Sequence, residues 1–412
     1  MNKKKIINDP VYGFLQIEHE AIYDLIQHPY FQRLRRIKQV GMTYLVYPGA
    51  VHSRYNHALG AMYLMQKAIQ TLRSKGHEIS SEESLGAQIA ILLHDIGHGP
   101  FSHALEYIFI EGVHHEAISL RMMQTINREM QGLLDTAIAI FTDAYPKKFL
   151  HQLVSSQLDM DRLDYLTRDS FFSGVSEGVV SWDRIIHMLE VRNDSLVVEE
   201  KGIYSIEKFI IARRLMYWQV YLHKTVLSAE FMISKILQRA QELCRGGEHL
   251  FGSPALLFFL ENRCDRIMFE RNDELLERFA AIDDHDLFSA IKVWAQHTDK
   301  VLSCLCDGLI HRRLNRVLLQ KKAFDTQLTE SLRQKIRDSY KISESEIHYF
   351  LQVGSVTNDA YLPEHDKIMI LSKSGKLTDV VEVSDNLNLK ALTQTVEKHY
   401  LCYPKGIALS TG

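Results

Sequence analysis

The sequence lacks long apolar runs, a strong net charge and paired cysteine motifs. No stretch approaches the ~18 apolar residues that a membrane-spanning helix needs, so we expect no transmembrane segment. The formal net charge is −3, and no overall basic field favours nucleic-acid binding. Residues 1–10 include a lysine run, as a signal peptide does, but no apolar segment follows. We therefore expect a cytoplasmic protein without membrane or nucleic-acid partners.

The five cysteines are odd in number and lack the spacing of a zinc finger. Cys304 and Cys306 form a Cys-x-Cys pair, but no second pair accompanies it. We interpret the cysteines as reduced residues that serve packing, which agrees with an intracellular compartment.

The length and composition predict a multidomain, mostly α protein. The 412 residues, 46% of them hydrophobic, can build a sizeable core. Helical patterns dominate up to about residue 347, interrupted by one β-hairpin, and strand-like patterns follow. We predict a helical core at 1–245, a helical extension at 246–345 and a small α/β appendix at 346–412.

Apolar spacing and turn residues predict the individual elements. Helices are expected at 20–40 with a break at Pro29, from about 58 to 72, and at 82–96, 114–128, 133–167 with a break at Pro146, 206–243, 254–342 and 388–398. Residues 44–49 should be extended, 188–205 should form a hairpin around Asn193-Asp194, and strands should follow from about 348. The segment 31–39 is strongly basic, which is typical either of a solvated helix face or of a helix facing a polyanion.

The most informative stretch is 92–103, where three histidines and one aspartate fall within ten positions. The apolar run 87–93 predicts a buried helix that carries His94 and Asp95 into the interior. Gly97 and Pro100 would then end that helix. Histidine beside aspartate suits a metal-centred hydrolytic site. A His-Asp dipeptide alone occurs by chance, so the rest of the chain must support this interpretation.

Three predicted helices carry residues that complete such a site. His57 precedes His94 by 37 positions, and Asp161 follows Asp95 by 66. Two imidazoles and two carboxylates give a near-octahedral site with open positions. This donor set suits an open site for Fe, Mn, Ni, Co or Zn better than it suits a closed structural zinc site, which would favour cysteine ligands. Such a metal lowers the pKa of a bound water and neutralises phosphate oxygens.

Several runs resemble the HD-domain deoxynucleoside triphosphate triphosphohydrolases, in particular the branch that also carries a sterile-alpha-motif domain. The resemblance covers residues 5–230 well and continues in outline to the C-terminus, without the N-terminal motif domain. The matching runs are 7–10 (Ile-Asn-Asp-Pro), 31–35 (Phe-Gln-Arg-Leu-Arg), 47–50 (Tyr-Pro-Gly-Ala), 54–57 (Arg-Tyr-Asn-His), 94–103 (His-Asp-Ile-Gly-His-Gly-Pro-Phe-Ser-His) and 161–165 (Asp-Arg-Leu-Asp-Tyr).

The resemblance implies a reaction in which a dNTP and water give a deoxynucleoside and triphosphate. It implies His57, His94, Asp95 and Asp161 as metal ligands. His115 would donate a proton to the leaving 5′-oxygen, and His98 and His103 would contact the phosphates. Glu106 stands where the family has an aspartate that orients the histidine, and it is one methylene longer.

The resemblance also implies substrate and effector contacts. Arg54, Arg162 and Arg213 would neutralise the β- and γ-phosphates. The sugar would be contacted by Gln39, Tyr165, Asp169 and Tyr221, and Mg²⁺ would accompany the nucleotide. A regulatory nucleotide would bind at Lys5, Gln32 and Arg35, and a homo-oligomer, dimer or tetramer, is expected.

Two departures from the family pattern concern specificity. Gln27-His28 stands where guanine-regulated relatives have an acidic residue, so the base preference of the regulatory site stays open. Leu222 replaces a polar residue near the substrate, which leaves base or sugar specificity open.

Three other functions compete with this hypothesis. A different HD phosphohydrolase or phosphodiesterase, acting on nucleoside monophosphates, cyclic nucleotides or another phosphoester, would keep the metal site without needing the three arginines. The run 174–178 matches the G-x-S-x-G pattern of serine esterases but follows an acidic helix rather than a strand, so we interpret it as coincidence. A non-catalytic nucleotide sensor would have no need of four metal ligands.

Overall fold

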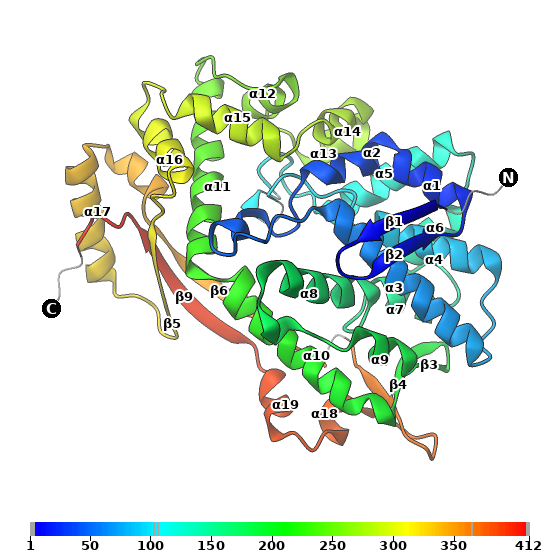
Figure 1. Ribbon diagram of the computed structural model, residues 1–412. Coiled ribbons are helices and arrows are strands. Elements are labelled where there is room, and N and C mark those ends of the chain that lie inside the picture. Colours follow the sequence, from blue (N-terminus) through cyan, green and yellow to red (C-terminus); the bar gives the residue numbers. More distant parts are fainter. Residues whose placement is uncertain (1–4, 102–103, 106, 364–365, 409–412) are drawn as a thin grey trace.

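The computed structural model describes residues 5–101, 104–105, 107–363 and 366–408 (Figure 1). His103 and Glu106 lie outside these residues. Helices form most of the molecule, with small sheets at its periphery and an α/β region at the C-terminal end. The prediction of a mostly α fold is confirmed.

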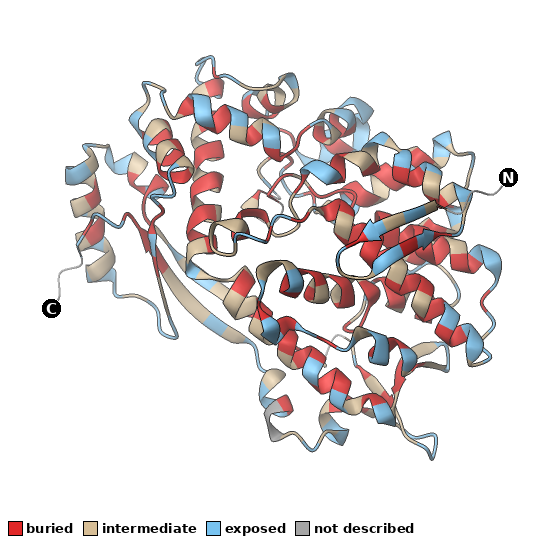
Figure 2. Cartoon of the chain, in the orientation of Figure 1, coloured by how far each residue is buried: buried red, intermediate tan, exposed pale blue. Residues whose placement is uncertain are grey.

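Three helices form the centre of the fold. α3 (Arg54–Ser74) packs against both α4 (Ser81–Leu93) and α8 (Met160–Ser173). Ser80 caps α4 in a capping box with Glu83, and Asp159 caps α8 by accepting from the Arg162 N–H. Figure 2 shows that buried residues fill this centre. The starts of α3 and α8 and the end of α4 converge, which positions the candidate site.

Further helices cover this centre and extend it. Their bounds are α1 (Glu20–Gln27), α2 (Pro29–Gln32), η1 (Arg33–Arg36), η2 (Gly41–Leu45), α5 (His115–Glu129), α6 (Asp135–Phe141), α7 (Lys148–Val154), η4 (Ser176–Gly178), α9 (Trp182–His187), η5 (Glu200–Gly202), α10 (Ile203–Met216), η6 (Tyr217–Tyr221), α11 (Lys224–Arg245), α12 (Pro254–Glu261), α13 (Arg266–Arg271), α14 (Asp273–Ala280), α15 (Asp284–Trp294), α16 (Lys300–Ile310), α17 (Thr326–Tyr340), η7 (Glu344–Tyr349), α18 (Val380–Val383) and α19 (Leu387–Leu392).

The strands form three sheets. An N-terminal antiparallel hairpin joins β1 (Lys5–Asp9) to β2 (Gly13–Ile17) and was not anticipated from the sequence. The other strands are β3 (Leu189–Arg192), β4 (Ser195–Glu199), β5 (Arg316–Gln320), β6 (Gln352–Asn358), β7 (Met369–Leu371), β8 (Leu377–Asp379) and β9 (Val396–Tyr403). Their orders are β3-β4-β7-β8 and β5-β9-β6. The C-terminal strands thus share sheets with strands from earlier in the chain.

The predicted hairpin is confirmed. β3 pairs antiparallel with β4, and the two turn residues Asn193 and Asp194 have φ values of 52° and 60°. Asparagine and aspartate tolerate this left-handed conformation, which a tight hairpin turn requires. The local sequence therefore suffices for this element.

Four predicted elements need correction. The segment 44–49 is not extended, because the 3₁₀ helix η2 covers Gly41–Leu45. The helix expected at 206–243 is interrupted by the π-helical turn η6, and α11 restarts with the His223 side chain as its cap. The helical region 254–342 contains β5, and the helix expected at 388–398 ends at Leu392 before β9. Both strands pair with distant partners, which local periodicity cannot reveal.

Two arginines of the basic segment 31–39 make contacts within the protein. Arg33 is only 1% exposed and donates to the carbonyl oxygens of Ile96 and His98, at 2.8 and 2.9 Å. Arg36 pairs with Asp283 of another helix. The segment therefore holds the loop after the His-Asp pair, which follows from tertiary contacts rather than from helix amphipathicity.

The five cysteines form no disulfide. Four of them are buried, and Cys304 is exposed. Among the described residues, no helix combines the length and apolarity needed to cross a membrane.

Candidate active site

Three predicted metal ligands converge from three helices. His57 lies in the first turn of α3, His94 follows the last residue of α4, and Asp161 lies in the first turn of α8. Asp161 Oδ1 is 3.0 Å from His57 Nε2 and 3.4 Å from His94 Nε2. The structure therefore brings together three side chains that are up to 104 positions apart in the sequence.

The other ring nitrogens of both histidines are already engaged. His57 Nδ1 is 2.7 Å from Asp164 Oδ2, and His94 Nδ1 is 2.6 Å from the Ile91 carbonyl oxygen. Because these are acceptors, each Nδ1 carries the proton and each Nε2 keeps a free lone pair. Both Nε2 atoms are buried and lack a hydrogen-bond partner in the described structure. A buried, unpaired imidazole nitrogen facing a carboxylate fits a divalent metal ion.

The electrostatics of this cluster also favour a cation. Burial lowers the pKa of His57, but the adjacent carboxylates of Asp161 and Asp164 outweigh burial and raise it to about 10. Burial raises the pKa of Asp161, but His94 and His57 lower it well below the usual range of a carboxyl group. The surroundings of His57 therefore stabilise a positive charge at this position. A metal ion can supply that charge instead of a proton.

Asp95 connects this cluster to a second one. Its Oδ1 lies 3.4 Å from His94 Nε2 and 3.3 Å from His98 Nε2, and Arg54 donates to its Oδ2. The His98 ring stacks on His115, with centroids 3.8 Å apart. Burial and the nearby Arg54 lower the pKa of His98 well below its usual value, so this imidazole is neutral. Two histidines thus stand next to the predicted metal position.

One cavity of about 460 Å³ is lined by the second cluster, by Asp161 of the first and by the predicted substrate contacts. Its lining residues are Gln39, Val40, Gly41, Thr43, Arg54, Asp95, His98, Phe101, His115, Asp161, Arg162, Tyr165, Asp169, Arg213, Tyr217, Tyr221, Leu222 and Glu230. All seven predicted substrate contacts are among them. The cavity is concave, polar at the clusters and aromatic around η6, as a small-molecule site requires.

Two cavity arginines are oriented by fixed partners. Arg162 Nη1 donates to Asp159 Oδ2 at 2.9 Å, and Arg213 Nη1 donates to Gln157 Oε1 at 2.9 Å. The Nε atoms of both arginines are buried without a hydrogen-bond partner in the part of the chain described. These guanidinium groups therefore retain donors for an anion in the cavity.

Asp169, a predicted sugar contact, lines the cavity and is also held by two neighbouring side chains. His52 Nε2 lies 2.8 Å from its Oδ1, and the Tyr221 hydroxyl donates to its Oδ2 at 2.7 Å. The His52 ring stacks on Phe172, with centroids 4.4 Å apart. Asp169 therefore orients Tyr221 while its own side chain is 3% exposed.

Sequence reasoning missed the residues that support the site from behind. The Asp164 carboxylate accepts hydrogen bonds from Arg168 Nε and Nη2. Arg168 Nη1 donates to Asp9 of β1 at 2.7 Å. A Cβ atom on Gly60 would overlap both Asp164 and Arg168. In the sequence, the helical spacing from Asp161 to Asp164 is the signal that could have revealed this support.

The predicted regulatory residues belong to the N-terminal region, and two of them, Lys5 and Arg35, each lie over an aromatic ring. Lys5 Nζ lies over the Tyr23 ring, 2.8 Å from its centroid, and Arg35 lies 3.6 Å from the Tyr55 centroid. Arg35 Nε donates to Gln32 Oε1 at 2.9 Å. Two cations over aromatic rings can bind an anion, but both are already engaged in these contacts.

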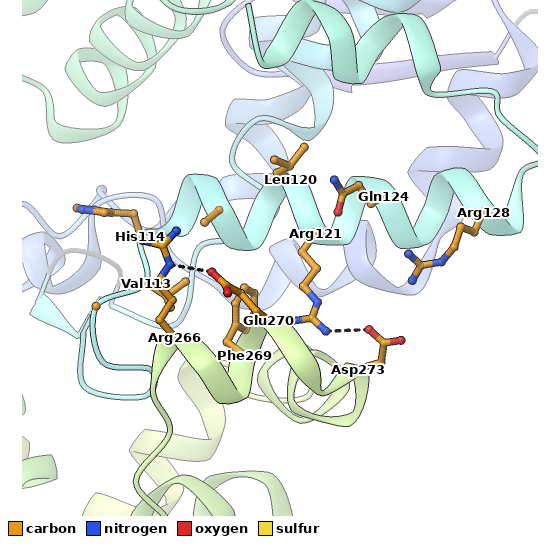
Figure 3. A pocket seen from close by; sticks show the side chains of 12 residues that line it. Val113, His114, Leu120, Arg121, Gln124, Arg128, Arg266, Phe269, Glu270 and Asp273 are labelled. Carbon is orange, nitrogen blue, oxygen red and sulfur yellow. Dashed lines mark hydrogen bonds and ion pairs between the residues drawn. The ribbon is translucent and has the colours of Figure 1, made fainter. Parts of the chain in front are cut away.

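A second cavity, of about 430 Å³, lies between α5 and α13 (Figure 3). Its arginines are largely neutralised, because Arg121 pairs with Asp273 at 2.8 Å and Arg266 with Glu270 at 2.8 Å. It contains none of the predicted catalytic, metal-binding or substrate-binding residues that the structure describes. We therefore assign it no catalytic role.

The G-x-S-x-G run has no esterase geometry. Ser176 begins the short helix η4, just after α8, and is exposed. Its Oγ contacts only the neighbouring Glu177 among the described residues, at 3.4 Å. A nucleophile elbow requires a strand before the serine, so the coincidence interpretation is supported.

Comparison with known proteins agrees with this site. The family descriptions HD domain and HD associated region match residues 54–169 and 180–247. The uncharacterized protein YwfO of Bacillus subtilis is 31% identical over 99% of this chain and 94% of its own length. A crystal structure of a phosphohydrolase from Bacteroides thetaiotaomicron is 52% identical, with a TM-score of 0.94 over 97% of this chain and all of that one.

More distant relatives have a named substrate class. The deoxynucleoside triphosphate triphosphohydrolase SAMHD1 homolog of Dictyostelium discoideum is 30% identical over 72% of this chain, and human SAMHD1 is 30% identical over 58%. The matches span 62% and 45% of those two proteins. From the family match, the full-length relatives and the assembled His-Asp cluster together, the chain belongs to the HD-domain phosphohydrolases.

Proposed function

We propose that the enzyme hydrolyses deoxynucleoside triphosphates to deoxynucleoside and triphosphate. The observation that carries the proposal is that one cavity is lined by residues of both His-Asp clusters, including Asp95 and Asp161, and by three arginines, Arg54, Arg162 and Arg213. A triphosphate carries about four negative charges, and arginine forks neutralise such groups efficiently. A site for a single phosphate would not require three arginines.

The metal ligands in this proposal are His57, His94, Asp95 and Asp161. The unpaired Nε2 atoms of the two histidines and the carboxylate of Asp161 support this assignment. The donor set suits Fe, Mn, Ni, Co or Zn. When bound, the ion would activate water and neutralise phosphate oxygens.

The protein residues supply binding and proton transfer. Water attacks the α-phosphorus, the bond from this phosphorus to O5′ breaks, and triphosphate is released. The leaving O5′ receives a proton from His115, while the neutral His98 stacked on it donates a hydrogen bond to a phosphate oxygen. Arg54, Arg162 and Arg213 hold the remaining phosphate charge.

The aromatic wall would hold the deoxyribose. Tyr165 and Tyr221 line the cavity with centroids 6.3 Å apart, and Asp169 fixes the Tyr221 hydroxyl. Gln39 Oε1 is buried without a hydrogen-bond partner in the described structure and could accept from a sugar hydroxyl. A close fit of these groups would exclude a 2′-hydroxyl.

We also propose that a nucleotide binds at Lys5, Gln32 and Arg35 and that the enzyme forms a homo-oligomer. The Arg35–Gln32 hydrogen bond and the incomplete burial of Lys5 and Arg35 support a regulatory anion site. Sedimentation with and without GTP or dGTP would test both points.

Product analysis tests the main proposal. The metal-loaded enzyme is incubated with each dNTP, alone and with GTP or dGTP, and the products are separated by chromatography. We expect deoxynucleoside and intact triphosphate from the wild type, and neither product from His94→Ala or Asp95→Ala. Turnover of nucleoside monophosphates or cyclic nucleotides without any triphosphate release would contradict the proposal.

A further inference from the structure

Glu230 is a carboxyl group in the catalytic cavity that the proposed chemistry does not use. It lies near the start of α11 and lines the cavity together with residues of η2 and η6. η2 and η6 both pack on α11, so this wall is built by three elements that carry none of the proposed metal ligands. Glu230 therefore faces a part of the substrate other than the reacting phosphate.

The Glu230 carboxyl has no protein partner in the cavity. Among the described residues, none donates a hydrogen bond to it or forms an ion pair with it. Burial alone raises its pKa to about 8, and no charged neighbour contributes to this shift. Glu230 is only partly exposed, and it lines the cavity, so its carboxyl can bind a polar group of a ligand there.

The remaining cavity residues leave one part of a nucleotide without a polar contact. The arginines neutralise phosphates, and Gln39, Tyr165, Asp169 and Tyr221 are assigned to the sugar. Leu222, on the same wall as Glu230, offers no hydrogen bond. No residue is yet assigned to the nucleobase, and the polar cavity residues still without a role are Thr43, Tyr217 and Glu230, of which only Glu230 carries a carboxyl group.

We propose that Glu230 determines which nucleobase the enzyme prefers, by hydrogen bonding to the base edge. This inference rests on the proposed hydrolysis of nucleotides. A neutral carboxyl offers one donor and one acceptor, which every base edge can match. An ionised carboxylate only accepts, and only guanine presents two adjacent donors, N1–H and the 2-amino group. The ionised form therefore favours dGTP.

The other ionisable groups near Glu230 do not obscure a pH-dependent base preference that arises from Glu230. From η6, Tyr217 and Tyr221 line the cavity, and burial raises the pKa of Tyr221 well above its usual value. From η2, Gly41 and Thr43 line it and do not ionise. Arginines and histidines of the cavity face the phosphates, which all four dNTPs share. A ratio between two dNTPs thus isolates the base.

The experiment compares kcat/KM for the four dNTPs in the wild type, Glu230→Gln and Glu230→Leu from pH 6.5 to 8.5. The wild-type ratio of dGTP to dATP should rise about three- to tenfold over this range. Glu230→Gln should give a ratio independent of pH, and Glu230→Leu should change the ratios among the four substrates. Glu242→Gln, an exposed glutamate on the same helix, should behave as the wild type.

The outcomes separate this inference from the proposed function. If the wild type hydrolyses dNTPs but Glu230→Leu keeps every ratio, Glu230 does not read the base. If the wild type hydrolyses none, the proposed function fails. Dissociation constants for the four dNTPs, measured by calorimetry on the same variants, then decide the inference without turnover.

Discussion

His57 Nδ1 lies 2.7 Å from Asp164 Oδ2, and both side chains are fully excluded from solvent. Because Asp164 accepts a hydrogen bond from His57 Nδ1–H, the lone pair of His57 Nε2 points toward Asp161. Asp164 is in turn held by Arg168, which pairs with Asp9 of the N-terminal hairpin. The orientation of one proposed metal ligand therefore depends on a buried ion network that reaches back to the first strand.

Asp164→Asn should weaken metal binding. The asparagine amide accepts the hydrogen bond from His57 Nδ1 more weakly than the carboxylate does. Arg168 also loses one of the two carboxylates that pair with it. Loss of such a supporting contact typically costs about 10- to 100-fold in metal affinity. Metal content after dialysis against a chelator measures this. Asp183→Asn, an aspartate that is 71% exposed, is the matched control. Full metal retention by the Asp164 variant would show that the network does not orient the ligand.

Gly60→Ala should destabilise the fold. The added methyl group would overlap Asp164 and Arg168, which are locked in an ion pair and cannot move apart cheaply. Overpacking of this kind costs about 1–3 kcal/mol in the free energy of unfolding. Urea denaturation measures the change. Gly406→Ala, where a Cβ meets nothing within 4 Å, should leave stability unchanged. Equal stability of both variants would contradict the proposed crowding.

Arg162→Ala and Arg213→Ala should selectively impair triphosphate hydrolysis. Each removes a cation that the proposal assigns to the β- and γ-phosphates, so kcat/KM for dNTPs should fall about 10- to 100-fold. Any activity on a simple phosphomonoester should fall much less. Arg266→Ala, an arginine whose side chain is 73% exposed, should change neither activity. An equal loss with both substrates would indicate a general structural role for these arginines.

Glu230→Gln should stabilise the protein more at high pH than at low pH. In the wild type, the unfolded chain ionises Glu230 near pH 4.5, whereas the folded protein keeps its proton until about pH 8. Wild-type stability therefore falls across this window, and glutamine has no proton to lose. We expect the stability difference in favour of the variant to grow by about 1–3 kcal/mol from pH 5 to pH 8.

Denaturant titrations of both proteins at several pH values measure that difference. Glu242→Gln supplies the control, because the Glu242 side chain is 54% exposed and should show no such trend. A constant difference between wild type and Glu230→Gln across the window would mean that Glu230 is as well solvated in the folded protein as in the unfolded chain.

The sequence by itself determined the features that depend on a few neighbouring residues. The apolar run 87–93 predicted a buried helix, the Asn193-Asp194 turn predicted the hairpin, and the run after His94 predicted the family. These signals are local, because helix periodicity, tight turns and motif loops are specified within a few positions.

Only the tertiary structure decided which distant groups meet. β5 is a strand because β9 pairs with it from about 80 positions away, which no local pattern indicates. Arg33 is buried because loop carbonyls accept its donors, although its neighbours suggested a solvated face. Asp164 behind His57 and the unpaired Glu230 likewise follow from the packing of separate helices. Such contacts depend on burial and on the direction of each side chain in the folded chain, and these come from the whole fold.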